Sequence, residues 1–256
     1  NQISVDDVLA VLNPLWHSKN ETASRLRMRL EKILDWARVR GYRRGPNPAV
    51  WRGNLDTQLT ARNKIQKVVH LKSLAYAQVP AFLVDLQKQT GTSARALHLG
   101  ILTAARPGEI RGAVWDEFDL ETGVWTVPAE RMKGRKEHRV PLSPQALELI
   151  KSLPVIDGSP LLFPAPRGGK KLSDMAMTAL LKRMGVESTA HGFRTSLRTW
   201  AAEETEHLPI VAEMALAHAQ ESKVVAAYQR GDLFKKRTAL LTAWATYLDQ
   251  VPDPED

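Results

Sequence analysis

The sequence predicts a mainly α-helical protein with a small antiparallel β-sheet, built as two domains. Apolar residues recur at helical spacing through most of the 256-residue chain. One stretch, residues 115–142, changes to strand-like runs on either side of a polar turn. The positive charge is concentrated at the front of the chain, which separates a basic part from a neutral part.

Charge divides the chain near residue 72. Residues 1–72 hold 14 Lys and Arg against 6 Asp and Glu, whereas residues 73–256 hold 22 of each, so the net charge of +8 belongs wholly to the first part. Such an asymmetry is typical of a module that binds a polyanion, and a solvated helical surface gives the same count. The 43% hydrophobic content fits a soluble globular protein.

The composition excludes several classes of protein. No apolar run reaches the roughly 18 residues that a membrane span needs, and the absence of cysteine excludes disulfide scaffolds, thiol chemistry and cysteine-based zinc sites. The Gly-Gly-Lys-Lys run at residues 168–171 lacks the spacing of a nucleotide-binding loop, and no motif pairs His or carboxylate metal ligands. Because the chain starts at Asn1 within a helix-like pattern, we expect it to be a fragment of a longer protein.

The basic part is predicted to hold two helices, residues 4–17 and residues 20–40. The second has an apolar face that includes Ile33 and Leu34, with a stripe of cations beside it. Residues 61–72 contain four cations and no acid, so we expect an extended linker there.

The neutral part is predicted to hold seven helices and a hairpin. The helices are expected at residues 79–89, 94–105, 144–152, 173–184, 192–204, 208–217 and 234–248. Residues 94–105 are apolar nearly all round, which predicts a buried helix. Strand-like residues 124–127 and 139–142 flank the polar turn 133–136, so we expect a β-hairpin.

Short motifs in the neutral part hold the candidate functional groups. Arg106 follows the buried helix and precedes Pro-Gly, a position that suits either a helix cap or a guanidinium held against a ligand. His191 and Arg194 are three positions apart at a predicted helix start, so their side chains point the same way. His218 is followed ten positions later by Tyr228, which lies among small residues.

Taken in order, these motifs resemble the tyrosine recombinase (phage integrase) family, most closely the integrases of satellite prophages and integrative islands. The family signature is an Arg, a hairpin Lys, His-x-x-Arg, a second His and a C-terminal Tyr, and the resemblance covers nearly the whole chain. The chain departs from the family at Ala217, where Gly is common, and at Val224-Val225, where a Thr is common.

The resemblance implies a two-domain tyrosine recombinase architecture. Residues 1–62 would form a helical, core-type DNA-binding domain, residues 63–72 a basic linker and residues 73–256 the catalytic domain. A further N-terminal domain that binds arm-type sites would lie outside this chain.

The resemblance also implies the chemistry. Tyr228 would attack a DNA phosphodiester, form a 3′-phosphotyrosyl link and release a 5′-hydroxyl. Arg106 and Arg194 would stabilise the charge that grows on the phosphate, because guanidinium groups donate in pairs. His191 and His218 would bind the same phosphate or handle the tyrosine proton.

The leaving 5′-oxygen needs a proton, and Lys133 in the hairpin turn is the expected general acid, with Lys136 as its rival. Glu109 is expected to orient one of the basic side chains. Because one phosphodiester is exchanged for another, the reaction requires neither a nucleotide cofactor nor a metal. The residues expected to contact DNA phosphates are Arg25, Arg29, Lys32, Arg43, Arg44, Lys64, Lys67 and Lys72.

The implied function is site-specific DNA integration and excision of a prophage or genomic island. The implied partners are double-stranded DNA with a core attachment site, three further copies of the chain in a tetramer on DNA, an excisionase and a host DNA-bending protein. The free chain is expected to be a monomer in the bacterial cytoplasm, without a membrane partner. The alternatives are a type IB topoisomerase-like enzyme and an inert DNA-binding regulator of the same fold.

Overall fold

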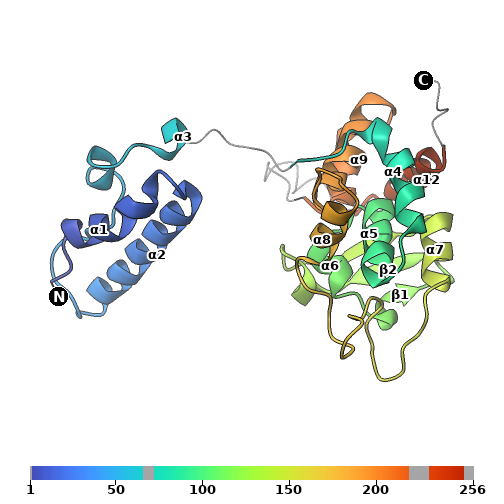
Figure 1. The fold of residues 1–256 in the computed structure, drawn as a ribbon, viewed down its shortest axis with the longest axis horizontal. Coiled ribbons are helices and arrows are strands. Elements are labelled where there is room, and N and C mark those ends of the chain that lie inside the picture. The colour runs from blue at the N-terminus through green and yellow to red at the C-terminus, as the bar shows by residue number, and fades with distance from the viewer. Residues whose placement is uncertain (1, 66–71, 219–230, 251–256) are drawn as a thin grey trace. The chain divides into compact units, whose positions relative to one another are not determined.

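The chain divides into two compact units, Asn1–His70 and Leu71–Asp256, each with its own hydrophobic core (Figure 1). The structure, a computed structural model, describes residues 2–65, 72–218 and 231–250. We refer to the two parts as the smaller unit and the larger unit.

The smaller unit is a pair of packed helices closed by a long loop. Its helices are α1 (Val5–Trp16), α2 (Asn20–Val39) and the single turn α3 (Arg62–Ile65), with a 3-10 helix at Leu55–Thr57. Ser4 caps α1 and exchanges hydrogen bonds with Asp7 in a capping box. Trp16 stacks on Trp51 at 5.7 Å between ring centroids and donates its Nε1–H to the Thr60 carbonyl at 2.9 Å. These contacts hold the loop against α1.

Two details of the smaller unit differ from the sequence prediction. Leu34 is buried as expected, but Ile33 is 60% exposed, because one residue of a helix turns the side chain by about 100° away from the core face. The expected linker begins with the helical turn α3 rather than extended chain, and its residues 66–71 lie outside the described residues.

The larger unit is mainly helical with one small sheet, as predicted. A 3-10 helix, Tyr76–Gln78, leads into the first helix, and the helices with their bounds are α4 (Val79–Lys88), α5 (Thr92–Thr103), α6 (Pro107–Arg111), α7 (Pro144–Lys151), α8 (Ala176–Arg183), α9 (Gly192–Glu203), α10 (Pro209–Ala215) and α12 (Phe234–Leu248). The seven predicted helices are confirmed with ends shifted by up to three residues. The additional α6 occupies a position where the sequence indicated only a turn after Arg106.

The sheet has three antiparallel strands in the order β1-β2-β3. Its strands are β1 (Phe118–Asp119), β2 (Val124–Val127) and β3 (His138–Pro141), with 3-10 helices at Trp115–Glu117 and Ala129–Arg131. In the predicted hairpin, Trp125 pairs with Val140 and Val127 pairs with His138. The register leaves residues 128–137 as the connecting loop, and Lys133 lies in its exposed turn. The short strand β1 is the part of the sheet that the sequence did not indicate.

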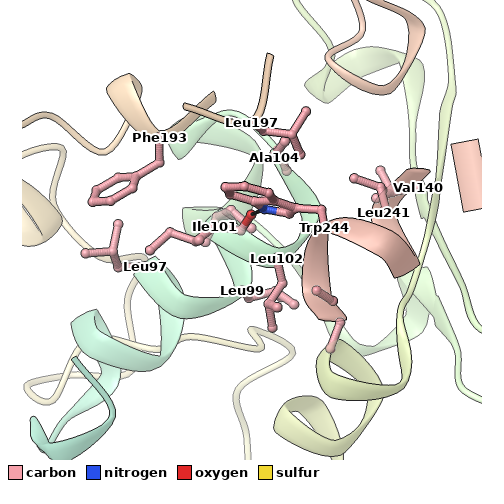
Figure 2. Close-up of a cluster of buried hydrophobic side chains, with 14 of the residues drawn as sticks. Leu97, Leu99, Ile101, Leu102, Ala104, Val140, Phe193, Leu197, Leu241 and Trp244 are labelled. Atoms are coloured by element: carbon pink, nitrogen blue, oxygen red, sulfur yellow. Dashed lines mark hydrogen bonds between the residues drawn. The ribbon is translucent and has the colours of Figure 1, made fainter. Parts of the chain in front are cut away.

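The helix predicted at residues 94–105 was expected to be buried. This is confirmed, because it corresponds to α5, which runs through the core of the larger unit. Figure 2 shows Leu97, Ile101 and Leu102 of α5 among side chains from other helices and β3. Trp244 of α12 packs there and donates its Nε1–H to the Ile101 carbonyl at 3.0 Å. Because α5 is fixed on all sides, the residues that follow it start from a rigid support. Within the described residues, no helix is both long and apolar enough to cross a membrane.

Candidate active site

The end of α5 places Arg106 at the start of α6. Ala104 ends α5 in the left-handed conformation with φ of 50°, and Arg106 follows as the extended residue before Pro107. The buried Glu109 carboxylate accepts the Arg106 backbone N–H and its Nη1–H, each at 2.8 Å, and the Ala217 carbonyl accepts Nη2–H at 2.6 Å. The guanidinium is therefore fixed in orientation, and Glu109 lies where the sequence placed an orienting carboxylate.

Arg194 lies in the first turn of α9 and is only 3% exposed. It donates to the carbonyls of Ala104 and, at 2.6 Å, Leu216, and its Nη2 lies 3.2 Å from Nε2 of His218. Burial, and after it the charge of Arg106, lower the pKa of Arg194 to about 10, so the group stays charged at neutral pH. Its Nε has no hydrogen-bond partner among the described residues.

The carbonyls that hold the two arginines come from the C-terminal ends of α5 and α10. A helix C-terminus carries partial negative charge, which stabilises a nearby cation. Both ends turn through a left-handed residue, Ala104 after α5 and Ala217 after α10, with φ of 50° and 48°. These turns leave the carbonyls of Ala104, Leu216 and Ala217 facing the arginines. The family departure at Ala217 thus keeps the backbone conformation that Gly adopts most readily.

His218 is held between two charged groups. Its Nδ1 lies 2.6 Å from Oε2 of Glu213, and its Nε2 faces the Arg194 guanidinium. Because a guanidinium only donates, Nε2 accepts and Nδ1 carries the proton that is donated to Glu213. Burial opposes the charge on Glu213, but hydrogen bonds from His218 and Arg198 hold its pKa below the ordinary value.

His191 is the residue before α9 and lies at the protein surface. Burial of part of the ring lowers its pKa, and the charges of Arg194, Arg106 and Lys133, and of His218 when it is protonated, lower it further. The imidazole is therefore neutral at pH 7. Lys133 in the hairpin turn is among the charges that lower this pKa. We call Arg106, Lys133, His191, Arg194 and His218 the cationic cluster.

Gly192 explains how α9 reaches this position. A Cβ on Gly192 would collide with the Lys72 carbonyl and come within 2.9 Å of the Ser73 Cα. The Thr189 N–H donates to the same Lys72 carbonyl at 3.2 Å. The start of α9 therefore packs directly on the backbone of residues 72–73, and only glycine fits there.

Tyr228 lies outside the described residues, which stop at His218 and resume at Gly231. Lys136, the alternative general acid, lies in the same exposed turn as Lys133.

The expected phosphate contacts fall into four groups. Arg25, Arg29, Lys32, Arg44 and Lys64 are exposed on the smaller unit, and Lys67 lies outside the described residues. Arg43 differs from the expectation, because it is buried and its Nη2 lies 3.3 Å from the Ile3 carbonyl, which leaves little surface for DNA. Lys72 belongs to the larger unit and pairs with Glu187 at 2.7 Å.

Several residues that hold the cationic cluster and the hairpin in place were not identified from the sequence. Glu213, the partner of His218, belongs to α10 and reaches His218 only because the chain turns back at Ala217. Arg131 bonds to Glu117, 14 positions away, and Arg237 bonds to Arg139, 98 positions away. Spacing along one helix gives no signal for such contacts. Within the described residues, no group of three or more His, Asp or Glu is placed to hold a metal ion.

The fold and the cluster define a class: a helical protein with a cationic site suited to the phosphate of a polyanion. Residues 72–232 match the Phage integrase family and residues 1–54 match the Phage integrase central domain. The chain belongs to the phage integrase family, which confirms the resemblance seen in its motifs.

Named relatives agree with this assignment. The chain is 33% identical to the prophage integrase IntZ of Escherichia coli (strain K12) over 253 residues, and 31% identical to the integrase of Enterobacteria phage P4 over 270 residues. Each comparison covers 97% of this chain but 61% and 60% of the relative, respectively. The chain thus spans about three fifths of the length of these relatives.

Solved structures show the same fold. A lambda integrase dimer bound to a COC' core site is similar with a TM-score of 0.61 and 19% identity, over 90% of this chain and 81% of that chain. The Tn1549 transposon integrase in complex with circular intermediate DNA is similar with a TM-score of 0.59 and 15% identity, over 90% and 86% of the two chains. The predicted fold class is confirmed.

Proposed function

We propose that this chain is the DNA-binding and catalytic part of a site-specific integrase, which cleaves and rejoins DNA strands through a 3′-phosphotyrosyl link at Tyr228. The observation that carries the proposal is the cationic cluster. Within one member of the phage integrase family, the ends of α5 and α10 and the starts of α6 and α9 bring Arg106, Arg194, His191 and His218 together.

The two arginines stabilise the phosphate. Attack on phosphorus adds negative charge to the non-bridging oxygens, and fixed donors stabilise that charge without having to reorganise. Arg106 is fixed by Glu109 and the Ala217 carbonyl. Arg194 is held by the carbonyls of Ala104 and Leu216, which fix its guanidinium beside that of Arg106.

Two protons move in the cleavage step. The Tyr228 hydroxyl forms the new O–P bond and gives up its proton. His191 accepts that proton, since its lowered pKa leaves the imidazole unprotonated before the step. The bond from phosphorus to the 5′-oxygen breaks, and Lys133 gives that oxygen a proton. His218, held by Glu213 and Arg194, completes the polar wall of the site. Rejoining reverses these transfers.

The exchange conserves the number of phosphodiester bonds, and we propose that it requires neither a nucleotide cofactor nor a metal. The proposed phosphate contacts of the smaller unit are five of its exposed cations, Arg25, Arg29, Lys32, Arg44 and Lys64. We further propose that monomers assemble into a tetramer on core-site DNA in the bacterial cytoplasm, with an excisionase and a host DNA-bending protein as partners. A lambda integrase tetramer bound to a Holliday junction has the same fold, which supports this assembly.

The comparisons favour an integrase over the two alternatives, because named relatives of the chain are prophage and phage integrases. A topoisomerase-like enzyme would relax supercoils as a monomer, and an inert regulator would bind the site without cutting it.

A nicked duplex tests the nucleophile. It carries the core sequence from the junction of the mobile element that encodes the chain. Cleavage next to the nick releases a short strand with a 5′-hydroxyl, and loss of this strand blocks rejoining. We expect a detergent-resistant protein–DNA adduct with the wild type and with Tyr247→Phe, whose ring stacks on Trp244 at 5.7 Å. Tyr228→Phe should form none.

An adduct formed by Tyr228→Phe would refute the assignment of the nucleophile. Wild-type protein that binds the duplex and forms no adduct would instead identify an inert regulator.

A further inference from the structure

Lys133, the proposed proton donor, lies in a loop that is long for a group that has to be held at a fixed position. It connects β2 to β3 through residues 128–137, and the turn from Lys133 to Glu137 is exposed. A proton donor must lie within hydrogen-bond distance of the atom that it protonates, and a displacement of about 1 Å can lower a rate on the order of 100-fold. An exposed turn does not meet this requirement unless its two ends are fixed.

The near end of the loop is held by Arg131, two residues before Lys133. Its Nη1 bonds to both carboxylate oxygens of Glu117, and its Nη2 donates to the backbone carbonyl of Glu109. Glu109 is the residue whose side chain orients Arg106. A single residue of α6 therefore contacts both the phosphate-binding arginine and the arginine beside the hairpin lysine.

The far end of the loop is held by Arg237 of α12. This side chain is only 1% exposed, and its Nη1 donates to the Arg139 carbonyl of β3 at 2.5 Å. Its Nε donates to the Asp232 carbonyl at 2.7 Å and its Nη2 to Asp232 Oδ2 at 2.9 Å. Arg237 thus joins β3 to the chain that enters α12.

Both anchors depend on the shape of arginine. Each guanidinium directs separate N–H groups at a carboxylate and at a backbone carbonyl, and the single ammonium of lysine cannot reproduce that fork. Burial of such a group is unfavourable unless its donors are satisfied, so both contacts are specific features of this fold.

We propose that Arg131 and Arg237 are positioning residues for Lys133: from the two ends of the hairpin loop they fix the distance between the lysine ammonium and the Arg106–Glu109 pair. This inference rests on the proposed function, in which Lys133 protonates the leaving 5′-oxygen. It adds that the acid is placed by contacts to α6 and α12 and not by the hairpin alone.

The test uses two nicked duplexes that differ in one atom. One has the ordinary 5′-oxygen at the cleaved bond, and the other has a bridging sulfur, whose thiolate leaves without a general acid. The full-length variants are Arg131→Lys, Arg237→Lys and Lys133→Ala. Arg111→Lys is the matched control, because Arg111 donates to a backbone carbonyl outside the hairpin, that of Leu172, at 2.8 Å. Arginine-to-lysine changes keep the charge, so DNA affinity should stay within about 3-fold.

With the oxygen duplex, we expect adduct formation to slow about 10- to 100-fold in Arg131→Lys and Arg237→Lys, and 100-fold or more in Lys133→Ala, as is typical for general acid loss. With the sulfur duplex, all three should react within about 3-fold of the wild type. Arg111→Lys should match the wild type on both.

Slow reaction of either arginine variant on the sulfur duplex would overturn the inference, because a defect in folding or in the nucleophile slows both substrates. Normal reaction of either variant on the oxygen duplex would overturn it too. If sulfur fails to rescue Lys133→Ala, then Lys133 is not the acid and the inference fails with that assignment. Absence of any adduct from the wild type would be the separate failure of the proposed function.

Discussion

Two histidines outside the cationic cluster, one buried and one half-buried, show how single residues respond to pH. His98 of α5 is buried and its Nδ1 has no partner among the described residues. His138 of β3 is half-buried near Arg237 and Glu109. Burial is the largest cause that lowers the pKa of each to about 4. Both imidazoles are neutral in the folded protein at pH 7.

Because of His98 and His138, we expect the folded protein to lose stability in mild acid. The unfolded chain protonates both groups near pH 6.5, whereas the folded protein does so only near pH 4, so the unfolded state binds more protons in that window. The free energy of unfolding should fall as the pH drops from about 6.5 towards 4. The urea concentration at the midpoint of unfolding, determined at pH 7.5, 6 and 5, measures this fall in the free energy of unfolding.

The control is the double variant His98→Gln/His138→Gln, which should show a flatter dependence over the same range. An equally steep fall in the double variant would contradict the account of these two residues.

At the scale of elements, the start of α9 packs so closely on residues 72–73 that it leaves no room for a Cβ at Gly192. Gly192 lies against the backbone of Lys72 and Ser73, and this packing fixes where His191 and Arg194 lie on either side of it.

Gly192→Ala should therefore lower stability by about 1–3 kcal/mol, the usual cost of overpacking, because neither neighbour is a movable side chain tip. Adduct formation should fall as well, since α9 must shift. Gly108→Ala in α6 is the matched control: no atom lies within 4 Å of its added Cβ, and alanine favours a helix. The thermal unfolding midpoints of the two variants, compared with that of the wild type, measure the effect on stability. Equal midpoints for Gly192→Ala and the wild type would refute the close-packing argument.

The positions of the helices and strands could be predicted from the sequence, but the contacts between them could not. Helix positions follow from apolar periodicity, which is local, and the hairpin follows from two strand-like runs around a turn. The sequence predicts that the helix containing residues 94–105 continues to residue 105, but α5 ends at Thr103 and is capped by Ala104. Nothing local indicates that an alanine adopts the left-handed conformation there. The partners Glu213, Arg131 and Arg237 were missed for a related reason: they depend on which elements meet in space, and that is set by the packing of the whole unit.

At the scale of the whole molecule, the charge division acquires a structural meaning. The smaller unit holds nearly all of the excess charge, and Arg29 and Lys32 lie exposed on one helix, α2. Neither makes an ion pair with any residue in the described ranges. The larger unit is close to neutral and gathers a few cations in one cluster. We infer that the smaller unit supplies DNA affinity and the larger unit the chemistry.

The division predicts the salt dependence of binding. The double variant Arg29→Gln/Lys32→Gln should lower the slope of log affinity against log salt concentration by about 2, roughly one for each lost phosphate contact. Lys88→Gln is the control, because Lys88 is paired with Asp85 at 2.8 Å on α4 of the larger unit. Duplex titrations at several salt concentrations measure the slope. If the double variant keeps the wild-type slope, these residues do not contact phosphates.

Mass determination of the peptide that retains DNA tests the central claim most directly. The covalent adduct is digested with nuclease and trypsin, which releases Tyr228 within residues 224–230 and Tyr247 within residues 238–256. We expect a 3′-linked nucleotide on Tyr228. A nucleotide on the peptide that contains Tyr247, or on any residue other than Tyr228, would contradict it.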